Sequence, residues 1–290
     1  MFNYRNLMFN MYTHVHRIYT TFKEENTKRQ TTAQQWWNTV NYSTGIKDLD
    51  KLLGGGLILG ENVLWEIETG TFAQEFMLVF MKQGIKEKNQ VILLDFIFPP
   101  QALLILLEPL LKELPKGWED RLLVLDCFTE SAGLGELIFT DFYDKAPQWM
   151  RKVPSSKDPE RFHHFFGRIE REFVSEGARL MFNSLTAMEH IWGRENTKTF
   201  FGHVCPALYA YKTLAYWTVE KQAHPNEFLA AIEHMTQVVI DLSKQGNKLT
   251  LQTKKAGGRY DPQTYQSTEY KVKGLAITLT DRLLPGSRGQ

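Results

Sequence analysis

The fold of this chain is decided by one stretch, Ser43-Thr44-Gly45-Ile46-Lys47-Asp48-Leu49-Asp50-Lys51-Leu52-Leu53-Gly54-Gly55-Gly56-Leu57-Ile58-Leu59-Gly60. Ile46, Leu49 and Leu53 are three and four residues apart, which predicts that they lie on one face of a short helix. The three glycines at 54–56 come next, and glycine tolerates the positive φ angles that end a helix. An apolar run at 62–67 follows and reads as a strand.

Beyond this stretch, apolar strand-like runs alternate with segments of helical period, which is typical of a parallel sheet covered by helices. We expect strands at 62–67, 91–96, 122–126, 180–182 and 214–219, and helices at 73–86, 100–111 and 159–176. After Gln237 we expect only strands, at 238–242, 249–254, 269–272 and 275–279, and the segment 145–157 reads as a loop. The pattern predicts one α/β domain with a mostly parallel central sheet and an antiparallel, β-rich C-terminal end.

The domain is expected to span residues 41–282, with a flexible C-terminus at 283–290. Residues 1–40 are rich in Asn, Thr and Tyr and show neither helical nor alternating periodicity. They also lack the apolar core and the small-residue cleavage site of a secretory signal. We therefore expect a disordered tail or an over-long gene start there, with Met8 and Met11 as alternative first residues.

Composition and charge exclude several classes of protein. Lys and Arg number 34 against 33 Asp and Glu, a formal net charge of +1, so the basic excess of a general nucleic-acid binder is missing. The most apolar stretch, 91–111, is interrupted by charged residues and prolines and cannot span a bilayer. Two cysteines are too few for a disulfide framework and match no metal-ligand spacing, which indicates a reducing cytoplasm.

The stretch at 43–60 resembles the opening of the KaiC-like, RecA-type ATPase family, whose pattern is S-T-G-I-x-x-L-D-x-L-L-G-G-G-L-x-x-G. The similarity runs without gaps to Gly84 and more loosely to about Leu279, over about four fifths of the chain. It implies a RecA-like P-loop NTPase fold. In this family ATP and Mg²⁺ bind at a phosphate loop, and the nucleotide lies between neighbouring subunits.

The phosphate loop of that family has the form G-P-P-G-T-G-K-T, in which backbone amides and a lysine bind the phosphates and a hydroxyl binds Mg²⁺. The matching residues are Ile67-Glu68-Thr69-Gly70-Thr71-Phe72-Ala73-Gln74. Ala73 replaces the lysine, Gln74 the hydroxyl residue and Phe72 the last glycine, while Glu68 adds a negative charge. Losing one charge-assisted hydrogen bond costs about 1.5–3 kcal/mol, so the resemblance predicts a vestigial loop.

Other positions of the family's machinery have also changed. Its F-E-E-P-P segment, with two acids that polarise the attacking water, matches a run with Ile97 and Phe98 at the acid positions. Neither side chain can accept a proton. Asn183 stands where the family has the aspartate of the Mg²⁺ shell, and it lacks the charge that a hard cation prefers. The family's K-x-R-G-x-x-H-D turn matches 254–261, where Lys254 is kept as a possible contact to a neighbouring subunit and Ala256 replaces the arginine.

Two hypotheses follow from these substitutions. The first is a catalytically degenerate KaiC-like protein with a regulatory or scaffolding role, bound to itself, to an active KaiC-like paralogue or to a signalling protein. It needs no cofactor. The alternative is a weak ATP-binding protein or ATPase that binds ATP and Mg²⁺ with a rearranged loop, with Lys82, Lys86 or Lys254 supplying the positive charge.

We expect neither a metal site nor nucleic acid as a partner. His163 and His164 are adjacent and point about 100° apart on a helix, so they cannot both bind one ion. No basic and aromatic stripe marks a nucleic-acid surface. Cys127 ends an expected strand, and no histidine is placed near it by any motif, so we interpret it as a buried structural residue.

Overall fold

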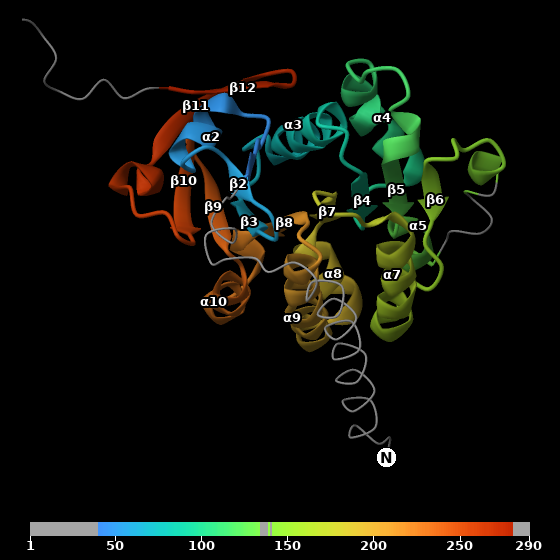
Figure 1. The fold of residues 1–290 in the computed structure, drawn as a ribbon. Helices are drawn as coiled ribbons and strands as arrows, with labels where there is room; N and C mark the ends of the chain where they lie inside the picture. The colour runs from blue at the N-terminus through green and yellow to red at the C-terminus, as the bar shows by residue number, and fades with distance from the viewer. Residues whose placement is uncertain (1–39, 134–138, 140, 281–290) are drawn as a thin grey trace, which may run out of the picture. The chain divides into compact units, whose positions relative to one another are not determined.

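The computed structural model describes residues 40–133, 139 and 141–280, and the statements below concern this part of the chain (Figure 1). The segment expected to be a tail over 1–40, apart from Val40, and the expected flexible C-terminus at 283–290 lie outside the described residues. Within the described part, no helix combines the length and the apolar character that crossing a membrane requires.

A ten-stranded sheet forms the centre of the protein. In spatial order its strands are β12 (Ala276–Leu279), β11 (Thr268–Lys273), β10 (Lys248–Ala256), β9 (Val238–Gln245), β3 (Asn62–Ile67), β8 (Leu214–Glu220), β7 (Arg179–Asn183), β4 (Val91–Asp95), β5 (Leu122–Asp126) and β6 (Met150–Lys152). In this order, the strands from β9 through β3, β8, β7, β4 and β5 to β6 pair in parallel. The strands β9, β10, β11 and β12 pair antiparallel. The predicted α/β fold with an antiparallel C-terminal end is confirmed.

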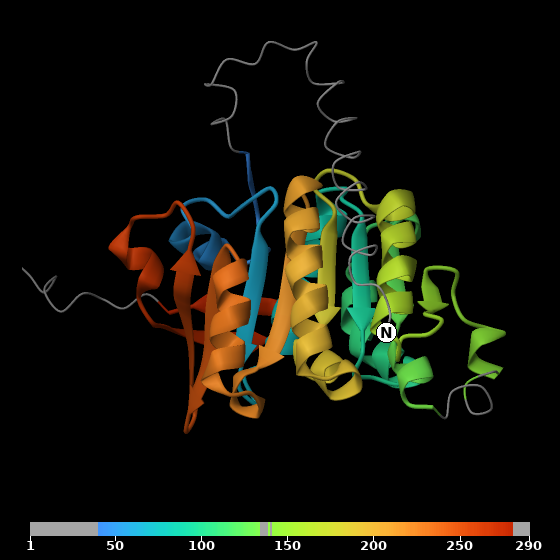
Figure 2. The ribbon, with the colours of Figure 1, turned by 90° about the horizontal axis from the view of Figure 1, so that it is seen from below.

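Helices cover both faces of this sheet. Figure 1 shows α2 (Lys47–Leu52), α3 (Ala73–Lys86) and α4 (Pro100–Leu111) above it, and α7 (Pro159–Phe173), α8 (Leu185–Trp192), α9 (Arg194–Ala210) and α10 (Asn226–Met235) below it. In Figure 2 the lower four run in front of the strands. Alternate residues of each strand face opposite layers. Val63 and Trp65 therefore pack toward α2 and α3, and Leu64 packs toward α7–α10.

The stretch that decides the fold has the structure its pattern predicts. Ile46, Leu49 and Leu53 are buried around α2. The glycines at 54–56 have φ angles of 70°, 116° and 120°, in the region that favours glycine. Leu57 and Ile58 then form β2 (Leu57–Ile58), which pairs with β1 (Asn41–Tyr42). The chain enters β3 directly afterwards.

The structure differs from the predicted elements mainly between 185 and 235, where α8, α9 and α10 were not expected. α9 contains Gly202 and Pro206, which weaken a helical pattern, and its stability depends on packing of side chains such as Phe201 against the sheet. Inside the expected loop 145–157, β6 adds an edge strand to β5. Among the C-terminal strands lies a 3₁₀ turn, Pro262–Tyr265.

Candidate functional site

The predicted site residues other than Lys254 lie along one edge of the sheet, which we call the carboxyl edge. β3, β8, β7 and β4 are neighbours and run parallel, so the segments that follow them all leave at this edge. Ligands of open α/β sheets bind at such an edge. It brings together the loop at 68–74 after β3, Ile97 and Phe98 after β4, and Asn183 at the end of β7.

The loop at 68–74 turns tightly before α3 and displays a large apolar side chain. Thr71 Oγ1 donates to the carbonyl of Glu68 at 2.7 Å, and Gly70 has a φ of 80°. Phe72 precedes the first residue of α3 in the left-handed region, with φ 56° and ψ 36°. A bulky residue is rare in this conformation, which glycine adopts freely. The Phe72 side chain is 49% exposed.

Two lysines that the sequence analysis missed lie beside this loop. The Lys221 Nζ lies 3.1 Å from Glu68 Oε1 and 2.6 Å from Asp241 Oδ2. The backbone amide of Lys244 donates to Glu68 Oε2 at 2.8 Å, and this bond is the main reason why the pKa of Glu68 is below its ordinary value. Glu68 therefore binds the strand β9 and the chain after β8, and it is not an isolated charge in the loop.

The ammonium group of Lys244 is close to the backbone of the loop. A Cβ atom placed on Gly70 would lie 3.1 Å from Lys244 Nζ. The side chain of Lys244 is exposed, and no ion pair with it is found among the described residues. Neither lysine could be placed from sequence, because both reach the loop through the parallel pairing of β3 with β8 and β9.

The lysines expected under the alternative hypothesis lie elsewhere. Lys82 donates to Glu113 Oε2 at 3.1 Å, and Lys86 is the last residue of α3, about 20 Å from its start by the rise of a helix. Lys254 Nζ lies 2.8 Å from Glu66 Oε2 and 2.6 Å from Glu233 Oε1. Its charge is thus matched by two carboxylates of its own chain.

Both the nitrogen and the oxygen of the Asn183 side-chain amide form hydrogen bonds with other residues of the chain. Its Nδ2 donates to Asp95 Oδ2 at 2.6 Å, and its Oδ1 accepts from Thr218 Oγ1 at 3.2 Å. The other oxygen of Asp95 accepts from the amides of Ile97 and Phe98 at 3.0 and 2.8 Å. Asp95 thereby fixes the segment after β4, and burial raises its pKa to about 6.

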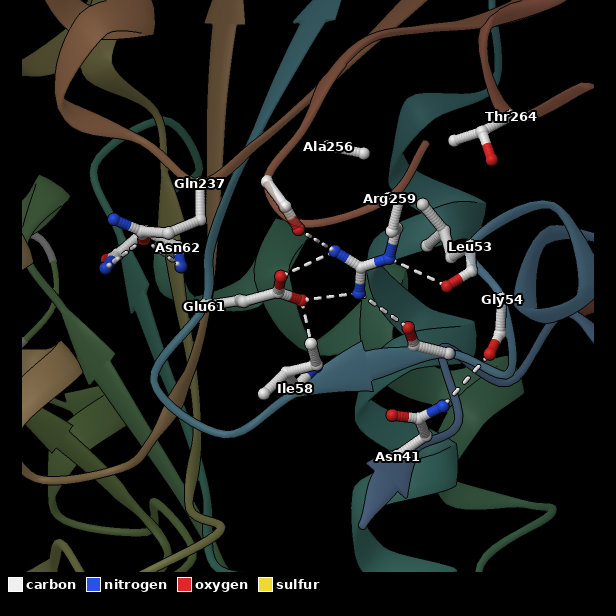
Figure 3. A network of polar contacts seen from close by, with 12 residues as sticks. Asn41, Leu53, Gly54, Ile58, Glu61, Asn62, Gln237, Ala256, Arg259 and Thr264 are labelled. Atoms are coloured by element: carbon white, nitrogen blue, oxygen red, sulfur yellow. Dashed lines mark hydrogen bonds and ion pairs between the residues drawn. The ribbon is translucent and has the colours of Figure 1, made fainter. Parts of the chain in front are cut away.

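The turn at 254–261 contains a third residue that the sequence analysis missed, Arg259 (Figure 3). Its guanidinium binds both oxygens of Glu61, at 2.6 and 2.9 Å, and donates to the carbonyls of Leu53 and Gly56 at 2.7 and 2.8 Å. These bonds hold the glycine turn of the opening stretch. Ala256, at the family's arginine position, is buried.

The cysteine and histidine residues considered in the sequence analysis include Cys127 and His163. Cys127 is buried, and burial raises the pKa of its thiol well above the ordinary value, which agrees with a structural role. His163 is half-buried, and its pKa is lowered mainly by burial. No group of three or more His, Cys, Asp or Glu side chains able to hold a metal ion occurs among the described residues.

Comparisons with known proteins bear on the fold. A family model described as PAXNEB protein matches residues 38–120, which include the opening stretch and the loop at 68–74. None of the curated proteins compared with the chain matches it. The solved structure of a KaiC-like protein from Pyrococcus horikoshii OT3 superimposes with a TM-score of 0.56 and 15% sequence identity. The match covers 84% of this chain and 100% of that one. The fold is RecA-like.

Proposed function

We propose that this RecA-like protein has lost Mg-ATP hydrolysis and acts by binding another protein at the carboxyl edge, as a regulatory or scaffolding subunit. The observation that carries the proposal is the half-exposed ring of Phe72, held in the left-handed region where the family's phosphate loop has glycine. Burying such a ring against a partner contributes roughly 1.5–3 kcal/mol.

The chemistry of the edge supports the loss of hydrolysis. Ala73 and Gln74 offer neither the ammonium nor the hydroxyl that a phosphate loop uses. Ile97 and Phe98 cannot activate water, and the Phe98 side chain packs against the protein's own core. The amide of Asn183 is bound to Asp95 and Thr218. The residues at the family's positions for the base, the metal ligand and the phosphate cation therefore cannot take those roles.

The partners that fit this proposal are a second copy of the chain, an active KaiC-like paralogue and a signalling protein. Both cysteines are free and buried, which fits the reducing cytoplasm where we place the protein. Light scattering at micromolar concentration tests self-association first. If the edge is the contact, Phe72→Asp dissociates the assembly.

Ile105→Asp is the matched control, because Ile105 is also a large exposed apolar residue, 72% exposed, but belongs to the middle of α4 and not to the loop. It should leave the assembly intact. A phosphate-release assay with Mg-ATP should give background rates. Turnover that disappears in Gly70→Trp would refute the loss of hydrolysis. A monomer that also fails to bind any RecA-fold partner would refute the binding role.

The second candidate function is weak nucleotide binding, and the position of Lys244 favours it. Its ammonium lies beside Gly70 and near the amino end of α3, where backbone amides attract anions. Calorimetry with ATP, with and without Mg²⁺, separates the two functions. Binding that is lost in Lys244→Ala would support this candidate, and no heat at millimolar ATP would exclude it.

A further inference from the structure

The carboxyl group of Glu66 occupies an unusual position in β3. The side chain is 1% exposed and points toward the layer of α7–α10, two residues after Leu64. Its Oε2 accepts from Lys254 Nζ at 2.8 Å. Its Oε1 is buried and has no hydrogen-bond partner among the described residues. An unsatisfied oxygen on a buried carboxylate is strongly unfavourable.

A second carboxylate, from α10, reaches the same ammonium. Glu233 Oε1 accepts from Lys254 Nζ at 2.6 Å. Lys254 of β10 therefore donates to two carboxylates, Glu66 of β3 and Glu233 of α10. Lys255 binds the end of α10 through the carbonyls of Glu233 and His234, at 2.8 and 3.1 Å. The pair Glu66 and Glu233 with Lys254 carries a net charge of −1 when both acids are ionised.

The remaining charged groups on this face do not supply the missing donor. Asp241 is the ladder partner of Glu66 on β9, but its carboxylate is paired with Lys221. Glu68, two residues after Glu66 on the same strand side, binds Lys221 and the amide of Lys244. A proton on Glu66 Oε1 provides a donor toward Glu233 and removes the excess charge.

We propose that Glu66 and Glu233 share one proton, and that this proton holds α10 against β3 and β10. α10 then docks on the sheet in a proton-dependent manner, with Lys254 as the common cation. Burial raises the pKa of Glu66 to about 7, and the neighbouring Glu233 carboxylate acts in the same direction. The proposal does not depend on nucleotide or partner binding at the carboxyl edge.

The sign of the pH dependence follows from linkage. Docked α10 keeps the proton up to about pH 7, whereas an undocked helix exposes Glu66, whose ordinary pKa is 4.5. Opening between these two values therefore releases one proton, and the equilibrium constant for opening rises about tenfold per pH unit. Docking is strongest near pH 4.5, weakens as the pH rises to 7 and is constant above it. It also weakens at pH values well below 4.5, because the pKa of Glu233 is lowered in the docked state by its contacts with Glu66 and Lys254.

Amide hydrogen exchange over residues 226–235 of the full chain measures this opening. After correction for intrinsic exchange, wild-type protection should fall about tenfold per pH unit between pH 5 and 7 and then level off. Glu66→Gln supplies an amide donor without a titrating proton and should abolish the slope. Glu233→Gln, at a partly exposed position, should do the same if the first variant folds poorly.

Glu68→Gln is the matched control, because it removes a carboxylate from the same strand side whose pKa is lowered, not raised. It should keep the wild-type slope. Carbon-13 spectra of the wild type should also contain a glutamate carboxyl that titrates near pH 7 and is lost in Glu66→Gln. A flat wild-type profile, a slope that persists in Glu66→Gln, or the absence of that signal would overturn the proposal.

Discussion

Asn183 donates its side-chain amide to the buried carboxylate of Asp95, with Nδ2 2.6 Å from Oδ2. The contact joins the ends of β7 and β4 at the carboxyl edge. This buried contact is stable because the amide of Asn183 is neutral and only Asp95 can carry a charge. An aspartate at 183 would place two carboxylates together in a buried site.

We therefore expect Asn183→Asp to lower the free energy of unfolding by about 3 kcal/mol at pH 8, because it leaves an uncompensated buried charge. The loss should shrink toward pH 5, where one acid of the pair is protonated and can donate to the other. Urea denaturation at both pH values measures it. The exchanged pair Asp95→Asn with Asn183→Asp restores one donor and one acceptor and should recover most of the stability, unless the two residues do not interact.

Arg259 is expected to be a structural residue of the glycine turn. Arg259→Ala leaves Glu61 as a buried, unpaired charge and should lower the unfolding free energy by about 3–5 kcal/mol. Arg259→Lys should recover little, because an ammonium cannot form the two-pronged contact with Glu61. Arg161→Ala, which breaks an exposed ion pair with Asp158, should change stability by less than about 1 kcal/mol. Equal effects at both arginines would contradict this role.

Gly84 allows α3 to approach β7. A Cβ atom at this position would lie 2.5 Å from the Cδ of the buried Arg179 and 2.8 Å from Val91 Cγ2. Arg179 cannot move freely, because it binds Glu87 and the carbonyl of Phe80. Gly84→Ala should therefore destabilise the protein by about 1–3 kcal/mol, although alanine normally favours a helix.

Gly167 in α7 is the control for that substitution. Its Cβ would meet only the ends of the flexible side chains of Arg171 and Glu170, at 3.9 and 4.0 Å. Gly167→Ala should stabilise the protein by about 0.5–1 kcal/mol through helix propensity. Thermal unfolding of the two variants should thus move in opposite directions, and a shift of both to higher temperature would show that Gly84 is not packed as described.

Glu170 on α7 should make stability depend on pH. Burial raises its pKa to about 7, and its Oε1 is buried without a hydrogen-bond partner among the described residues. Because the folded pKa is above the ordinary value of 4.5, its contribution is fully present below pH 4.5 and is lost as the pH rises to 7.

Glu170→Gln should consequently stabilise the protein at pH 8 relative to the wild type and have little effect at pH 4.5. Urea midpoints across this range measure the difference. Glu160→Gln, on the exposed part of the same helix, should show no such trend. A constant difference between Glu170→Gln and the wild type would contradict the assigned pKa.

Local sequence determined most of the sheet and the first helices. β3, α3, α4 and β5 begin and end where their periodicity predicts, because each segment buries one face or both faces in a regular pattern. The same holds for α2 and the glycine turn at 54–56. The substitutions Phe72, Ala73, Gln74, Ile97, Phe98 and Asn183 are also readable by aligning the chain with the family's motifs.

Tertiary structure alone decided which charges meet. Lys244 contacts Glu68, and Lys254 contacts Glu66, across more than 170 residues, because β3 lies between β8 and β9 and β10 follows β9. Arg259 reaches Glu61 and the glycine turn across almost 200 residues. The periodicity of apolar residues in a segment predicts only which of its faces are buried. The partner of a charged side chain depends instead on strand order and register, and these are set by the packing of the whole sheet.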